Sequence, residues 1–136
     1  MTPVNVSYPV PARWAQLDAI AGPRFTPWKK VQEALSGRPV GSARVQWTHC
    51  SDPGVQALLD STQDVKWLNL ERTAGGMLLY FRVRLETYAI AVARSTPVTL
   101  GKSAPGSLEV HIGKTRCVWE GTASAITSAS RILIAH

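Results

Sequence analysis

The alternation of apolar and polar residues is clearest between Gly75 and Arg94, the longest apolar, β-branched and aromatic run in the chain. In its first half, the apolar residues Leu79, Phe81, Val83 and Leu85 alternate with Tyr80, Arg82, Arg84 and Glu86. A period of two is typical of a β-strand with one buried and one solvated face. The charged residues at its centre exclude a transmembrane span, which needs about 20 apolar residues. This stretch therefore predicts the central part of a sheet.

The second half of the same run alternates bulky with small residues, namely Tyr88, Ile90 and Val92 against Ala89, Ala91 and Ala93. This pattern predicts a central strand with another element packed closely on its alanine face. The junction at Glu86-Thr87 is either a tight hairpin or a bulge in one long bent strand.

A helical period governs the first third of the chain. Residues 12–21 carry one apolar stripe, Pro11 suits the first helical position, and Gly22-Pro23 is a stop signal. A second helix is predicted from Pro27 to Ser36, with Thr26 as its N-cap. Its apolar stripe predicts an inner face made of Trp28, Val31 and Leu35.

The remaining elements give the fold class. We predict strands at residues 42–49, 66–72, 108–112 and 115–120, a short helix after Asp52-Pro53, and a loop at residues 96–107. The tail from Thr122 to His136 fits a helix, although residues 131–135 alone would also pass as a strand. Residues 1–10 are expected to be extended or poorly ordered. The order of elements predicts one α+β domain over residues 1–136, with a mainly antiparallel sheet, two to three helices in the N-terminal half and a C-terminal helix.

The net positive charge of the chain indicates which classes of partner it could bind. The formal net charge of +6 and the pI near 9.8 favour nucleic acid, an anionic membrane surface or an acidic protein. The N-terminus has no basic segment followed by an apolar core, so no secretory signal is evident. We therefore expect a cytoplasmic location, no membrane association, and free thiols at Cys50 and Cys117.

No motif is specific enough to fix an activity. Gly101-Lys102-Ser103 matches the end of a phosphate-binding loop, but Pro105-Gly106 prevents the helix that should follow. Cys50 lies just before a predicted helix, where a thiolate would be stabilised, yet the adjacent His49 should point to the opposite face of its strand. The histidines are scattered and form no ligand-like spacing. We predict no catalytic residue, no metal and no cofactor.

The remaining candidate site is electrostatic. If the apolar half of the central run faces the core, its polar half forms the opposite face of the sheet, and cations from other elements could widen that face. Such a surface holds phosphates by charge and stacks a base on an aromatic ring. The predicted nucleic-acid-binding residues are Tyr80, Arg82, Arg84, Arg44, Arg116, Lys29 and Lys30.

We therefore expect a small, basic, non-catalytic binding protein, with nucleic acid (DNA or RNA) as the favoured ligand. The alternative is a protein–protein interaction module, such as an inhibitor or assembly factor, that binds an acidic partner protein. The abundance of Arg and the five tryptophans supports this alternative. One of the strand residues Trp47, Trp67 and Trp119 could be exposed, and Trp and Arg are common anchors of protein interfaces. A cysteine-dependent enzyme is the third hypothesis.

Overall fold

The computed structural model describes residues 1–136, apart from the side chains of Lys102 and Ser103. Its helices are α1 (Pro11–Ala21), α2 (Pro27–Leu35), α3 (Pro53–Asp60) and α4 (Ala123–Ala135). Its strands are β1 (Val4–Asn5), β2 (Val45–Cys50), β3 (Trp67–Thr73), β4 (Gly76–Val83), β5 (Glu86–Ala93), β6 (Val98–Ala104), β7 (Ser107–Ile112) and β8 (Thr115–Glu120). The predicted α+β class, with a C-terminal helix and an antiparallel sheet, is confirmed.

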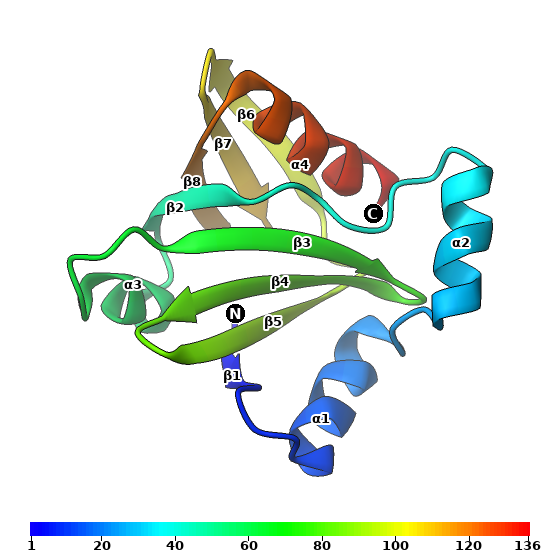
Figure 1. Ribbon diagram of the computed structural model, residues 1–136. Helices are drawn as coiled ribbons and strands as arrows, with labels where there is room; N and C mark the ends of the chain where they lie inside the picture. The colour runs from blue at the N-terminus through cyan, green and yellow to red at the C-terminus, as the bar shows by residue number, and fades with distance from the viewer.

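The strands form one sheet of order β1-β5-β4-β3-β2-β8-β7-β6, in which neighbouring strands are antiparallel. The β2–β8 ladder joins the two halves of this sheet. Figure 1 shows that strands β3–β5 and strands β6–β8 run at a steep angle to one another. Helices α3 and α4 pack on the inner face of the bent sheet, and α1 covers β4 and β5 on its outer face.

The two faces of β4 and β5 enter different cores. On the inner face, Leu79, Phe81 and Ile90 belong to the main core, together with Ile126 and Ile132 of α4. On the outer face, a smaller core contains Leu17 and Ala21 of α1 with Leu78 and Ala89 of the sheet. The predicted close packing on the alanine face is therefore confirmed, and α1 is the element that packs there.

The β4–β5 connection is a hairpin, which removes the alternative of a bulge. Val83 pairs with Glu86, so the turn consists of Arg84 and Leu85 and lies before the predicted junction. Arg84 has a φ of 58°, in the left-handed region that this kind of hairpin turn requires. Leu85 is 84% exposed, which corrects its assignment to the buried face. Arg84 likewise leaves the sheet face on which it was predicted.

The prediction of a loop over residues 96–107 is wrong, because Val98–Ala104 forms strand β6. This strand lies at the edge of the sheet and pairs only with β7, with a register shift between Leu100 and Ser103. Gly101 lies within this edge strand, which tolerates it, whereas Pro97 and Pro105, which also made the segment look like a loop, lie just outside its two ends. The phosphate-loop-like tripeptide lies in β6, and the side chains of Lys102 and Ser103 are outside the described structure.

The tail is helical over Ala123–Ala135, so residues 131–135 belong to α4 rather than to a strand. Near the other end, Val4–Asn5 pairs with β5. In the described structure, none of the helices combines the length and the apolar composition needed to cross a membrane.

Candidate interaction surfaces

Helix α2 packs on the rest of the protein with its charged side, whereas the sequence predicted that its apolar side would face inward. The Thr26 hydroxyl caps it by accepting a hydrogen bond of 3.2 Å from the Lys29 amide. Its buried residue is Glu33. The predicted inner residues Trp28, Val31 and Leu35 are instead 69%, 47% and 83% exposed. The prediction that this stripe, including Trp28, lies in the core is therefore wrong.

The physical reason is Arg72, which is buried at the end of β3. Its Nη2 lies 3.3 Å from Oε2 of Glu33, and its Nε donates a hydrogen bond of 2.9 Å to the Pro39 carbonyl. Its guanidinium lies 5.1 Å from the centre of the Phe25 ring. A buried cation is costly unless an anion accompanies it. Glu33 supplies that anion, and the opposite side of α2 consequently faces solvent.

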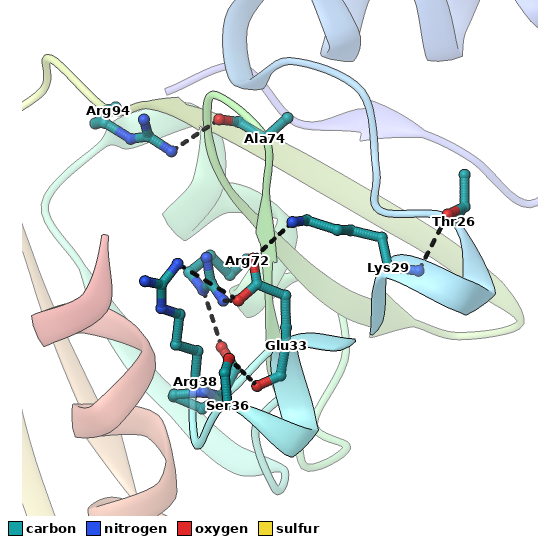
Figure 2. Close-up of polar contacts among 9 residues, drawn as sticks. Thr26, Lys29, Glu33, Ser36, Arg38, Arg72, Ala74 and Arg94 are labelled. Atoms are coloured by element: carbon teal, nitrogen blue, oxygen red, sulfur yellow. Dashed lines mark hydrogen bonds and ion pairs between the residues drawn. The ribbon is translucent and has the colours of Figure 1, made fainter. Parts of the chain in front are cut away.

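Exposed cations add to this arrangement. Lys29 Nζ and Arg38 Nη1 lie 3.7 Å and 3.8 Å from the Glu33 carboxylate, and Figure 2 shows both converging on it together with Arg72. Lys30 Nζ is 3.1 Å from Oε1 of Glu71, so a second ion pair ties α2 to β3. Exposed pairs contribute only about 0–1 kcal/mol each. The buried Glu33–Arg72 pair therefore decides the orientation of α2.

The outer face of α2 is defined here as Trp28, Val31 and Leu35. Positions i, i+3 and i+7 of a helix lie on one side, so these side chains form a continuous apolar stripe. Complete burial of a large apolar side chain is worth about 1.5–3 kcal/mol. Exposed apolar patches with polar rims commonly mark interaction sites. This face is the first candidate surface.

The predicted basic face is only partly open. Tyr80 is half-buried in the small core beneath α1, and its hydroxyl donates a hydrogen bond of 3.2 Å to Glu71 Oε2. Burial, and then the charge of Glu71, raise the pKa of Tyr80 well above its usual range, against the opposing charge of Arg24. Lys30 lies beside it, paired with the same carboxylate. Tyr80 therefore holds α1 against the sheet more than it offers a ring to a ligand.

The half-exposed aromatic residue on this face is Trp67, which is 42% exposed. Gln46 is its register partner on β2, and the pairing of Leu68 with Phe81 sets Arg82 opposite Trp67 on β4. The Arg44 guanidinium lies 4.5 Å from the centre of the Trp67 ring. The second candidate surface, called the Trp67 surface below, consists of Arg44, Gln46, Trp67 and Arg82. Period-two alternation identified its strand, but only the fold shows which tryptophan remains exposed.

The other predicted cations lie elsewhere. Lys29 is engaged with Glu33, and Arg84 is in the β4–β5 turn. Arg116 lies on β8, where its Nε is 2.8 Å from Oε1 of Glu109. The hydrogen bonds from Arg116 and then from His111 lower the pKa of the Glu109 carboxyl. This salt-bridged patch is thus a site separate from the Trp67 surface.

Cys50 lies in the main core, with its sulfur 4.0 Å from that of Cys117. His49 is exposed on the opposite face of the same strand, as its adjacent position predicts. His111 contacts Glu109 through Nε2. These positions separate Cys50 from both histidines and give no support to a thiol–imidazole pair.

Within the part of the chain that the structure describes, no group of three or more His, Cys, Asp or Glu side chains could hold a metal ion. Comparison of the chain with protein-family models, with curated proteins and with solved structures finds no match. The outer face of α2 and the Trp67 surface are therefore the two candidate interaction sites.

Proposed function

We propose that the protein is a non-catalytic binding protein that docks on a partner protein through the outer face of α2. One observation carries the proposal: a helix whose charged side is fixed to the body by a buried ion pair directs Trp28, Val31 and Leu35 into solvent. Apolar anchors at i, i+3 and i+7 are the pattern by which a helix fills an apolar groove on another protein.

The charges around α2 indicate the chemistry of that groove. Lys29 and Arg38 are exposed where α2 meets the body, next to Glu33, and the chain as a whole carries a net charge of +6. An acidic rim on the partner would complement these cations and speed association. A second copy of this chain fits less well, because it would bring the same cations together.

The proposal predicts a selective loss of binding from alanine variants. Tagged protein would be purified from its native cells after nuclease treatment, and the affinity for the recovered stoichiometric partner would then be measured. Trp28→Ala and Leu35→Ala should each weaken binding by about 30-fold or more, as buried interface anchors do. Lys114→Ala, on the exposed β7–β8 turn, should leave it unchanged. Equal affinities for all three variants would contradict the proposal.

The partner's charge is tested in the same assay. Lys29→Glu with Arg38→Glu should slow association and remove most of its salt dependence. If these reversals strengthened binding, the partner's rim would be basic and its proposed chemistry wrong.

A second candidate function, nucleic-acid binding, is favoured by the Trp67 surface. The Arg44 guanidinium over the Trp67 ring and the neighbouring Arg82 combine a stacking group with cations that could contact phosphates. Lys30 is close to this face but is paired with Glu71, which reduces its contribution. The ligand of this chemistry would be a single strand, whose bases are unpaired and available for stacking.

A labelled single-stranded oligonucleotide titrated against salt tests this second function. Replacing Arg44 and Arg82 together by alanine should reduce the slope of log affinity against log salt by about 1.4, because each lost phosphate contact contributes about 0.7. The matched control, Lys114→Ala with Arg131→Ala, removes the same charge from exposed positions elsewhere. If the slope changed equally in both double variants, the binding would be a nonspecific attraction that depends only on net charge.

A further inference from the structure

The two cysteines face each other across the ladder that joins the halves of the sheet. Cys50 of β2 and Cys117 of β8 are direct register partners. The Cys117 thiol donates to the Cys50 sulfur, with the sulfur atoms 4.0 Å apart. Directly opposed residues in an antiparallel pair have Cα atoms about 4.5–5.5 Å apart. That range lies inside the roughly 4.4–6.8 Å that a disulfide accepts.

The two thiols are not equivalent. The hydrogen bond from Cys117, with a further one from the Asp52 backbone amide, lowers the pKa of Cys50 despite its burial. The pKa of Cys117 is raised, because its proton is held by Cys50 and because it is buried. Cys50 lies at the start of α3, where the Asp52 amide favours a thiolate, so we assign it as the attacking sulfur and Cys117 as the resolving one.

We infer that Cys50 and Cys117 form a reversible intramolecular disulfide when the protein meets a low-molecular-weight disulfide such as oxidised glutathione. Both thiols are buried, so the exchange proceeds through local opening of the β2–β8 ladder around Cys50. The Cys50 thiolate exposed in this way attacks one sulfur of the small disulfide, breaks its S–S bond and releases one thiolate. The Cys117 sulfur then attacks Cys50 and releases the second. The two protein thiols are oxidised, the small disulfide is reduced to two thiols, and the two protons pass to the released thiolates.

The bond would tie together residues that are 67 positions apart in the chain. It would also fix the β2–β8 ladder, which joins β1–β5 to β6–β8. Closing so long a loop restricts the unfolded chain more than the folded one. We therefore expect the oxidised protein to melt about 10 °C above the reduced protein.

The test uses the full chain in buffers of increasing oxidised-to-reduced glutathione ratio, held until the mass stops changing. Thiols are then alkylated in denaturant, and intact mass and peptide mapping report their state. The inference predicts a monomer that has lost two hydrogen atoms, takes up no alkylating agent and yields a Cys50–Cys117 peptide pair. Two alkylated cysteines in the most oxidising buffer would overturn it, as would a disulfide between two chains.

Variants separate the two sulfurs. Cys117→Ala should trap glutathione on Cys50, whereas Cys50→Ala should acquire it more slowly on Cys117. The opposite order would reverse the assigned roles. A wild-type protein that keeps glutathione without closing the bond, or an oxidised form that melts no higher than the reduced form, would contradict the inferred geometry. These outcomes are independent of whether α2 binds a partner.

Discussion

Leu17→Ala is expected to lower the free energy of unfolding by about 2–5 kcal/mol, whereas Leu35→Ala should change it by no more than about 0.5 kcal/mol. The two leucines lie on neighbouring helices and differ in their surroundings. Leu17 is 1% exposed in the core beneath α1, and Leu35 is 83% exposed on the outer face of α2. Removing Leu17 leaves a cavity, while removing Leu35 takes away surface that water already covers.

Equilibrium urea unfolding of the two variants measures this difference without any knowledge of the partner. The comparison is matched, because the same side chain is truncated in a helix each time. Trp28→Ala should resemble Leu35→Ala, since Trp28 is also largely exposed. If Leu35→Ala cost as much as Leu17→Ala, the outer face of α2 would be packed against the body in solution, and the surface proposed for docking would not exist.

Glu33→Gln is expected to destabilise the protein by about 3–5 kcal/mol, because it leaves the Arg72 guanidinium buried without an anion. Side chains of both residues are almost fully enclosed, so solvent screens their interaction little. The other two partners of Glu33, Lys29 and Arg38, are exposed and add little. Replacing the exposed carboxylate of Glu120 by Gln changes the net charge equally and should cost less than about 0.5 kcal/mol.

A double-mutant cycle identifies the source of this effect. Glu33→Leu combined with Arg72→Met removes both charges, and the pair should be far less destabilised than the sum of the single variants. Hydrogen exchange would show whether α2 opens locally in Glu33→Gln, since that helix depends on the ion pair. If Glu33→Gln unfolded at the same urea concentration as Glu120→Gln, the ion pair would not control the orientation of α2.

The sequence was sufficient to predict that residues 27–35 are helical but not how that helix is oriented. An apolar stripe on an amphipathic helix predicts an inward face, because burial of apolar area is the usual driving force. Here that preference is overcome by Arg72. It continues the inward alternation of Leu68 and Leu70, so a buried cation at the end of β3 could have been foreseen. Its anion could not, because only the fold brings Glu33 to that strand.

Period-two alternation located the central strands correctly, but it did not locate the turn between them. A two-residue hairpin turn preserves the alternation, so Leu85 remained in phase with Val83 although the chain had already left the sheet. The predicted basic face was limited by the same lack of tertiary information. Charge alone could not reveal that Lys30 and Arg116 are paired with Glu71 and Glu109. It also could not reveal that α1 covers Tyr80.

Site-specific photo-crosslinking in the native cell is the most direct test of whether the outer face of α2 docks on a partner protein. A benzophenone amino acid would replace Trp28 in one protein and Lys114, on the β7–β8 turn, in another. We expect position 28 to crosslink to one protein, at a peptide that lines an apolar groove with Asp or Glu at its rim, and position 114 not to crosslink to it. Crosslinks from position 28 only to lipid, only to a second copy of the chain, or no more often than from position 114, would contradict this expectation.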